Sequence, residues 1–429
     1  MTGAIELHPH AGPGFGRSRK RHTWSAVALA IALGSPAAAA PDTPAPVLSL
    51  AEALARAPAV AEAALASAES AAAAARVGLA ARPAAPLLGL GTTRYSGSTL
   101  VTLSEEVRWG GQRHYAVQAA QSSSVAARAT AADTAAGVRS TVRHLWFELA
   151  RAEATAELSH RVVADAGRLA EATAARVEGG RSPRVEWLRA SAAKEALAAE
   201  ALAAEEGVAV AWGDLAAFLG LDAQALRTTG GERPAVPELA AIDALADPAR
   251  LALHPAVVAA QAELDAARAG HELARRLRLP GLGIEVGMTS GDPGLPGTDA
   301  ATTVTLAFPL TGAPATSLAD AELAAARARF DAVARAAQAR LSAAAHRCRG
   351  ERARWQALEV SALPAAETAA ALLREAWEAG RGQLVEVLDA DRSLLDVRSA
   401  SLGAWVAVQE AWADLLYAAD EGKGDDVPN

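Results

Sequence analysis

Two stretches of the chain, GRSPRVEWLRA at residues 180–190 and GRGQLVEVLDA at residues 380–390, are variants of one motif. Gly and Arg open both copies, and Val, Glu, Leu and Ala follow at the same spacing. The 200-residue offset also relates two dipeptides further along the chain, Ala211-Trp212 with Ala411-Trp412 and Asp214-Leu215 with Asp414-Leu415. Self-similarity of this extent indicates one supersecondary unit that is used twice. The sequence therefore predicts a tandem duplication.

Glycine and proline around the first motif mark the ends of long helices. Residues 112–177 contain no proline and carry Ala, Leu, Arg and acidic residues at helical spacing, which predicts one helix of about 100 Å. Gly179-Gly180 should end it. We expect Ser182 to cap the next helix and Pro183 to take its first position, because proline needs no N–H there. This return helix is predicted over 184–219.

The second half repeats this plan. A long helix is predicted over 317–379, a turn at Gly380-Arg381-Gly382 and a return helix over 383–419. Pro364 lies inside the long helix, where proline removes a backbone hydrogen bond, so we expect a kink or a break there. Shorter helices, over 50–81 and 247–277, are predicted to begin the two halves.

Between the short and the long helix, each half changes to period two. In the second half, apolar residues alternate with small or polar ones in two runs, which are Leu282, Ile284, Val286 and Met288, then Val304, Leu306 and Phe308. The first half has a shorter version, Leu88, Leu90 and Thr92, then Val101 and Leu103. Alternation with turns between the runs predicts two β-hairpins. Glu105-Glu106 stands where the second half has Phe308-Pro309, which leaves open where the first hairpin ends and whether it spans fully.

Four strands with one apolar face are typical of a membrane β-barrel. Four strands cannot close a barrel, and a membrane-spanning sheet has no free edge, so several chains would have to contribute. The alternative is a small antiparallel sheet that covers a soluble helical domain.

The N-terminus has the pattern of a secretory signal peptide. Four basic residues up to Arg21 precede an apolar run at 26–33, and small residues follow at 37–40. The run is too short to span about 30 Å of hydrocarbon. The predicted divisions are therefore a signal peptide at 1–39, a first repeat at 48–221, a linker at 222–246, a second repeat at 247–419 and a disordered tail at 420–429.

Composition excludes several classes of protein. Hydrophobic residues make up 51% of the chain but aromatic residues only 4%, so most apolar side chains are alanines that favour closely packed helices. The net charge of −8 argues against a nucleic-acid partner. Cys348 is the only cysteine, which leaves no disulfide framework, and we expect it to be an inert thiol within a helix.

The sequence fragments that look catalytic are isolated. Ser191 and Lys194 fit an S-x-x-K pattern, but they lie in a predicted helix and no K-T-G follows. His271-Glu272 lacks the second histidine of a zinc-protease helix, and no nucleotide-binding glycine loop is present. The sequence predicts no catalytic residue, no metal site and no cofactor.

Over residues 48–419 the chain resembles the TolC family of outer-membrane efflux proteins. The most specific segments are RWGGQR at 108–113, ARVEGGRSPRVEWLRA at 175–190 and WEAGRGQLVEVLDADRSLLDVRSA at 377–400. The resemblance implies a mainly α fold, with a long α-helical periplasmic barrel and four strands per chain, and a homotrimer that closes a 12-stranded membrane β-barrel. The RWGGQR segment is similar to the heavy-metal, CzcC-like branch.

The same resemblance implies a location and partners. The protein would be a passive exit duct in the outer membrane, part of a tripartite efflux system. Its partners would be outer-membrane lipid, a periplasmic adaptor (membrane fusion protein) and an inner-membrane pump of the resistance-nodulation-division type. The alternative is a soluble periplasmic coiled-coil or adaptor-like interaction protein. The sequence does not name the exported compound.

Two sites are implied by the resemblance. The turns between long helices would dock the adaptor through Gly179, Gly180, Arg181, Ser182, Gly380, Arg381 and Gly382. Glu386 and Asp389 would line the periplasmic entrance, and their spacing of three places them on one helix face. The alternative for this pair is an ordinary solvated face.

Overall fold

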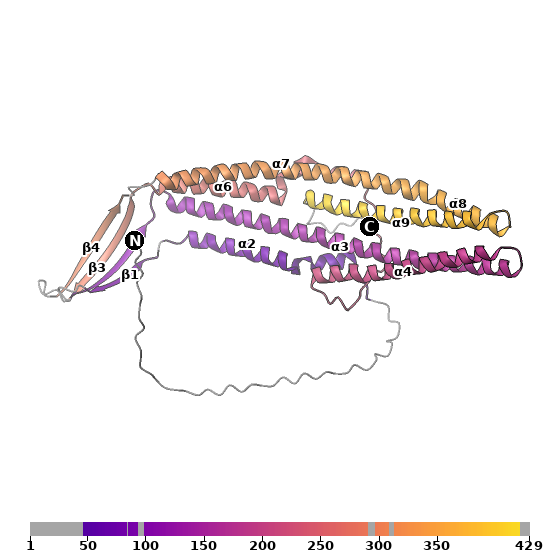
Figure 1. Ribbon diagram of the computed structural model, residues 1–429. Coiled ribbons are helices and arrows are strands. Elements are labelled where there is room, and N and C mark those ends of the chain that lie inside the picture. Colours follow the sequence, from indigo (N-terminus) through magenta and orange to yellow (C-terminus); the bar gives the residue numbers. More distant parts are fainter. Residues whose placement is uncertain (1–45, 84, 93–97, 291–296, 309–312, 421–429) are drawn as a thin grey trace, which may run out of the picture. The chain divides into compact units, whose positions relative to one another are not determined.

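The structure is a computed structural model that describes residues 46–83, 85–92, 98–290, 297–308 and 313–420. Contacts group residues from Ala45 onward into one unit. The predicted signal peptide and the tail after Asp420 lie outside the described residues. Figure 1 shows long helices and a sheet whose strands lead into them.

The first repeat contains both predicted long helices. Its elements are α1 (Leu50–Arg56), α2 (Ala61–Ala80), β1 (Leu87–Thr92), β2 (Thr99–Val107), α3 (Gln112–Glu178) and α4 (Arg184–Leu219). The single helix predicted over 50–81 is wrong in one respect, because a 3₁₀ turn at Ala57–Ala59 divides it. Pro58 within that turn cannot donate a backbone hydrogen bond, which explains the division.

The second repeat follows the same order. A helix that the sequence did not predict, α5 (Leu239–Leu245), comes before α6 (Pro255–Arg276), β3 (Gly281–Ser290), β4 (Thr298–Ala307), α7 (Ala313–Ala357), α8 (Leu363–Glu378) and α9 (Leu384–Ala418). Helix α6 begins at Pro255, later than the predicted start at 247. His254 caps it, because its Nδ1 accepts a hydrogen bond from the Ala256 N–H at 3.2 Å.

Pro364 neither breaks nor ends the long helix of the second repeat. The backbone passes from α7 into α8 through one π turn, Leu358–Ala362, and Pro364 lies in the first turn of α8. In the π turn the Leu363 N–H donates to the Leu358 carbonyl oxygen, five residues earlier, so the helix continues into α8. Helix α3 has no such interruption, so the two repeats differ at this level.

Buried tryptophans hold the middle of the helices together. Trp146 of α3 is fully buried, and its Nε1 donates to the Leu48 carbonyl oxygen at 2.9 Å. Trp212 of α4 is also buried, and its Nε1 donates to the Ala223 carbonyl oxygen at 3.0 Å. Burying an aromatic side chain of this kind stabilises a fold by about 1.5–3 kcal/mol. The start of the first repeat and the residues that follow α4 are thus fixed to its core.

The segment between the repeats is also fixed in place. Gln409 of α9 is buried, and its Nε2 donates to the Pro234 carbonyl oxygen at 2.9 Å. The Arg352 guanidinium donates to the Pro237 carbonyl oxygen at 3.0 Å. The predicted linker is therefore ordered, and it contacts both repeats, because the Thr229 N–H donates to Glu153 Oε1 of α3 at 2.9 Å.

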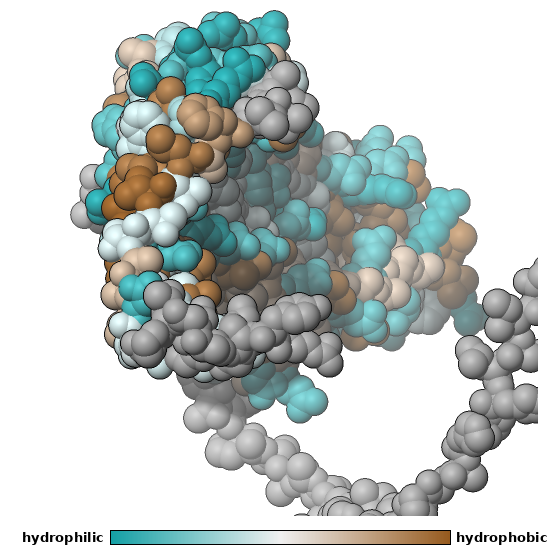
Figure 2. Space-filling model, turned by 90° about the vertical axis from the view of Figure 1, so that its left-hand side faces the viewer, coloured by the Kyte–Doolittle hydropathy of each residue, from teal (hydrophilic) through white to brown (hydrophobic). Residues whose placement is uncertain are grey.

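The four strands form one antiparallel sheet in the order β1-β2-β3-β4. The register places apolar residues opposite one another, with Leu103 against Val286 and Ile284 against Val304. These side chains are exposed, Val304 to 64%. Figure 2, in which the sheet faces the viewer, shows a brown hydrophobic band over the strands.

Glu105 and Glu106 are both part of β2, which therefore does not end before them. Strand β2 has nine residues and pairs with β3 through Val107, whereas β1 has six.

Among the helices that the structure describes, none is long and apolar enough to cross a membrane.

The RWGGQR segment makes the turn from the sheet into α3. Gly110 and Gly111 have positive φ angles of 66° and 87°, which glycine adopts without strain. Trp109 Nε1 donates to the Pro280 carbonyl oxygen at 2.6 Å, and Gln112 Nε2 to the Arg276 carbonyl oxygen at 3.2 Å. These contacts fix the turn between the sheet and α3.

Candidate functional site at the helix tips

The turn between α3 and α4 is a Schellman motif. The N–H of Arg181 donates to the Arg176 carbonyl oxygen at 2.8 Å, and the N–H of Gly180 donates to the Val177 carbonyl oxygen at 3.0 Å. Gly180 has a φ of 68°, the left-handed conformation that this motif requires. We call the residues from Gly179 to Pro183 the first tip. Gly179, Gly180 and Arg181 are exposed there, and Ser182 is half-buried.

Helix α4 begins at Arg184 as predicted, but the predicted capping is wrong by one residue. Pro183, and not Ser182, occupies the N-cap position, and α4 begins at Arg184. Pro183 has an extended backbone, with ψ at 147°. Proline fits this position because it has no N–H to satisfy and its φ is already restricted.

The turn between α8 and α9 repeats the same geometry. The N–H of Arg381 donates to the Ala376 carbonyl oxygen and that of Gly380 to the Trp377 carbonyl oxygen, both at 2.9 Å. Gly380 has a φ of 75°. A Cβ on Gly382 would lie 3.1 Å from the Trp377 backbone N. The positive φ favours glycine at position 380, and the close neighbour of Gly382 is the preceding helix of the same chain. We call the residues from Gly380 to Leu384 the second tip.

Glu386 caps the second return helix. Its Oε2 accepts a hydrogen bond from the Gln383 N–H at 3.2 Å, and the Gln383 side chain accepts one from the Glu386 N–H. This reciprocal capping box satisfies two helix-end donors. At the same position of the first repeat, Glu186 has no such partner, because Pro183 offers neither an N–H nor a side-chain acceptor. Glu386 is exposed, so it has a structural role and remains accessible.

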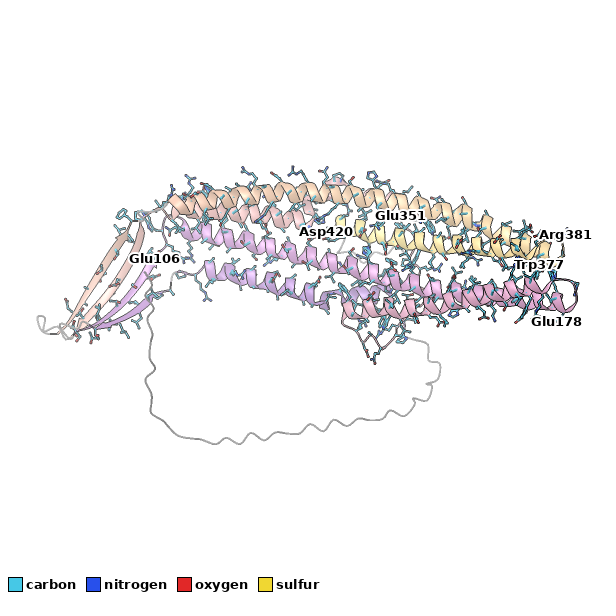
Figure 3. All side chains as sticks on the ribbon, viewed as in Figure 1. Glu106, Glu178, Glu351, Trp377, Arg381 and Asp420 are labelled. Atoms are coloured by element: carbon cyan, nitrogen blue, oxygen red, sulfur yellow. The ribbon has the colours of Figure 1, made fainter. Side chains whose placement is uncertain are left out.

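The helices next to the two tips pack on each other through a small apolar cluster. Buried residues from both repeats form it, namely Leu169, Ala170, Ala190, Trp377, Leu384 and Val387. Arg176 of α3 crosses to the other repeat. Its Nη1 donates to the Trp377 carbonyl oxygen at 2.7 Å, and its guanidinium carbon lies 4.6 Å from the centre of the Trp377 ring. Figure 3 labels Trp377 and Arg381 at the second tip and Glu178 beside the first.

Asp389 lies in a different environment from Glu386. It lines a cavity of about 500 Å³ between α9 and the α3–α4 hairpin, whereas Glu386 is not among the lining residues. Asp391 lines the same cavity and accepts a hydrogen bond from Arg374 at 2.7 Å. Asp389 is exposed on this wall. The two predicted entrance residues therefore occupy neighbouring positions with separate contacts.

The fragments that the sequence analysis set aside do not come together. His271 Nε2 lies 2.9 Å from Asp320 Oδ1, and the pair bridges α6 and α7. Within the described ranges, no three His, Cys, Asp or Glu side chains are grouped so that they would hold a metal ion. Cys348 is buried in a cluster with Leu341 and Leu415, as the sequence predicts for an inert thiol.

The contact between Arg176 and Trp377 was not predicted from the sequence. A signal for it exists in the comparison of the repeats, because the equivalent positions carry Ala376 and Val177. Arg and Trp each occur in only one of the two repeats at these positions. A contact between one repeat and the other would explain this difference.

Residues 249–419 match the protein family described as Outer membrane efflux protein. The match covers the second repeat, from the turn before α6 to the end of α9. No curated protein matches the sequence.

Solved structures with a similar fold cover nearly the whole described chain. A membrane protein from Pseudomonas aeruginosa has a TM-score of 0.74 at 20% identity, over 86% of this chain and 93% of that chain. The outer membrane protein VceC from Vibrio cholerae has a TM-score of 0.73 at 18% identity, over 86% of this chain and 95% of that chain. The open state of the Neisseria gonorrhoeae MtrE outer membrane channel has a TM-score of 0.69 at 20% identity, over 89% of this chain and 91% of that chain.

These findings confirm the resemblance to TolC-family outer-membrane efflux proteins that the sequence indicates. The fold class is confirmed, because the part of the chain that the structure describes is mainly helical and has four β-strands. The matched family is one of outer-membrane efflux proteins and not of enzymes. This agrees with the predicted outer-membrane location and with the prediction that the chain has no catalytic residue.

Proposed function

We propose that the chain is the exit channel of a tripartite efflux system, a passive duct through the outer membrane for compounds that an inner-membrane pump delivers. The observation that carries this proposal is the sheet. Most of its large apolar side chains share one face and are exposed to solvent in the single chain, Leu90 to 76% and Met288 to 51%. A soluble protein has no reason to expose such a band, whereas membrane strands place it against lipid.

A homotrimer would complete the sheet. Strands β1 and β4 are its two edges, and each has one neighbour. Backbone groups at a free edge cannot be satisfied in hydrocarbon. Three copies related by rotation would give each β4 edge the β1 edge of the next copy, which makes twelve strands in a closed ring.

The tips support docking of a periplasmic adaptor (membrane fusion protein). Arg181 and Arg381 are exposed at equivalent points of two similar turns, so the duplicated motif offers two similar surfaces. The pump would be of the resistance-nodulation-division type. Energy for export would come from the pump, since the chain carries no nucleotide-binding motif.

Glu386 and Asp389 are proposed to line the periplasmic entrance. Both carboxylates are exposed near the second tip. If three chains bring these pairs around one opening, their charges would repel one another and attract cations, with energies of about 1 to 4 kcal/mol per pair at 4 Å. The capping contact of Glu386 does not prevent this, because a carboxylate accepts several interactions at once.

The proposal is tested by placing arginine on each face of β4. Val304→Arg puts a charge on the apolar face and should reduce the trimer recovered from the outer membrane, because a cation on the lipid-facing side of a membrane strand is destabilising. Thr303→Arg, one residue away on the opposite face, is the matched control and should assemble normally. Outer-membrane fractions are extracted in detergent, cross-linked and sized.

Equal assembly of the two variants would contradict a lipid-facing sheet. Recovery of the unmodified protein as a monomer in the soluble periplasmic fraction would favour the alternative, a soluble coiled-coil or adaptor-like interaction protein.

A further inference from the structure

Arginines gather where the sheet meets the helices. Six of them lie at the end of α2, around the start of α3 and at the end of α6, and we call them the basic collar: Arg82, Arg108, Arg113, Arg275, Arg276 and Arg278. All six are exposed. Figure 2 shows hydrophilic residues gathered at the upper edge of the sheet, beside the hydrophobic band.

Specific contacts bring the three parts of the collar together. The Arg113 guanidinium donates to the carbonyl oxygen of Ala81, which precedes Arg82. The Arg276 guanidinium lies over the ring of Tyr115 at 5.7 Å. Arg278 donates to Thr316 Oγ1 at 2.6 Å, at the start of α7. The collar is therefore one continuous surface, although its residues come from both repeats.

Little of this positive charge is neutralised within the chain. Among the described residues, Arg275 alone of the six forms an ion pair, with Glu272 at 3.3 Å. The side chains of Arg82 and Arg108 contact no acidic group that the structure describes. Glu105 and Glu106 are the other acidic residues nearby in the sequence, and both are exposed on β2. Of the six arginines, five thus have no ion pair within the described residues.

The collar borders the apolar face of the sheet directly. Val107 pairs with Leu282 in the last row of the sheet, next to Arg108 and four residues from Arg278. Trp109 is 39% exposed in the same place, with its indole N–H satisfied by the Pro280 carbonyl oxygen. A tryptophan with an apolar ring and a bonded N–H is typical of a membrane interface.

We propose that the basic collar binds the phosphate groups of anionic phospholipids in the periplasmic leaflet of the outer membrane, an inference that rests on the proposed channel function. The sheet would lie in the hydrocarbon, Trp109 at its boundary and the arginines at the level of the lipid phosphates. Guanidinium groups bind phosphate in a planar, bidentate way and remain charged at every physiological pH. Basic groups at this depth attract anionic lipid.

Binding would fix the depth of the channel in the membrane. Arg113 and Arg276 are tied to α2 and α3 through Ala81 and Tyr115, so a lipid phosphate held by the collar would hold the helices at a set distance below the sheet. The helix tips would then have a defined height above the inner membrane.

The test removes the two arginines whose side chains make no described contact. Mature protein in detergent is titrated with short-chain phosphatidylglycerol, and the bound lipid is counted by native mass spectrometry. The Arg82→Gln, Arg108→Gln double variant should bind phosphatidylglycerol about fivefold more weakly per arginine removed. Binding of phosphatidylcholine with the same chains should not change.

The matched control is Arg128→Gln with Arg327→Gln. Both residues are exposed, and they lie about 22 Å beyond Arg113 along α3 and about 16 Å beyond Thr316 along α7. This variant should bind phosphatidylglycerol like the unchanged protein. Inorganic phosphate serves as the second probe, and it should compete with the lipid only at far higher concentration.

Three results would overturn the collar as a lipid site. In the first, the collar variant binds phosphatidylglycerol as well as the unchanged protein does. In the second, the control variant loses as much phosphatidylglycerol binding as the collar variant. In the third, equimolar phosphate displaces the lipid. If the collar variant does not fold, the salt dependence of binding to the unchanged protein decides, because contacts with phosphate must weaken as salt rises. Unchanged protein that fractionates as a soluble monomer would refute the channel instead.

Discussion

The guanidinium of Arg176 stacks over the Trp377 ring at 4.6 Å and donates a hydrogen bond to the Trp377 carbonyl oxygen at 2.7 Å. The contact joins the end of α3 to the end of α8, so it ties the tip of one repeat to the tip of the other. Trp377 is 3% exposed, and the tip cluster surrounds it. The contact occurs once in the chain, because the equivalent residues are Ala376 and Val177.

Removing this contact should loosen both tips. Arg176→Ala loses a cation–π contact and a charged hydrogen bond, together roughly 1–2 kcal/mol at a partly exposed site. Backbone amides at the ends of α3 and α8 should then exchange hydrogen about 5- to 30-fold faster, which exchange mass spectrometry measures. Arg181→Ala, at the exposed first tip, should leave exchange in α8 unchanged. Equal exchange in both variants would show that the contact does not hold the tips.

A side chain at Gly380 should distort the second tip. Gly380→Val forces a β-branched residue to a φ of 75°, which costs at least about 1–2 kcal/mol. Export should fall while trimer and membrane insertion persist, because the sheet is far along the chain from this turn. The comparison is Gly403→Ala inside α9, where a Cβ meets nothing within 4 Å, and which should stabilise the helix. Normal export by the valine variant would argue against docking at this tip.

Neutralising the entrance carboxylates should change ion conduction. Glu386→Gln keeps the capping box, since glutamine also accepts the Gln383 N–H, and Asp389→Asn removes the second charge. The double variant should show weaker block by multivalent cations and lower cation selectivity in planar bilayers. A matched pair beside the first tip, Glu178→Gln with Glu186→Gln, should conduct like the unchanged protein. Unaltered selectivity and block in the double variant would refute the entrance assignment alone.

Cys348 should resist thiol reagents until the protein unfolds. Burial raises its pKa to about 11, in opposition to the smaller effects of Arg349 and Arg352. At pH 8 the folded protein would then hold roughly a hundredfold less thiolate than a thiol with an unshifted pKa. Labelling with iodoacetamide should be negligible in buffer and complete in denaturant.

The same shift has a consequence for stability, because the folded state binds this proton more tightly than the unfolded chain. Stability should therefore fall as pH rises from about 9 towards about 11, and it should be unaffected by Cys348 below that range. Replacement of Cys348 by Ala should abolish this part of the pH dependence. Rapid labelling of the folded protein at pH 8 would contradict the buried position.

The long helices and the hairpins could be predicted because their signals are local. Helix α3 lacks proline throughout, and Gly180 and Gly220 mark helix ends at which only a positive φ closes the turn. The strands followed from alternation of period two. Pro364 shows the limit of such reasoning, since a proline predicts a disturbed helix but does not distinguish a break from a π turn.

The contacts of the candidate site were less predictable because they join distant parts of the chain. Glu386 and Asp389 share a spacing that predicts one face, yet one of them caps a helix and the other lines a cavity against α3 and α4. The fixing of the linker by Gln409 and Arg352 also depends on tertiary packing. Gln383 lies within one helical turn of its partner Glu386, whereas the other partners lie far away in the sequence.

The most direct test of the channel itself is electrical. Mature protein is purified from the outer membrane, confirmed as a trimer and added to a planar lipid bilayer under voltage. A closed barrel joined to a helical duct should give discrete, reproducible steps of conductance, and Val304→Arg, which disturbs the lipid-facing side of β4, should insert far less often. A trimer that enters the bilayer but leaves the current at the baseline, in repeated trials and at every voltage, would contradict the account.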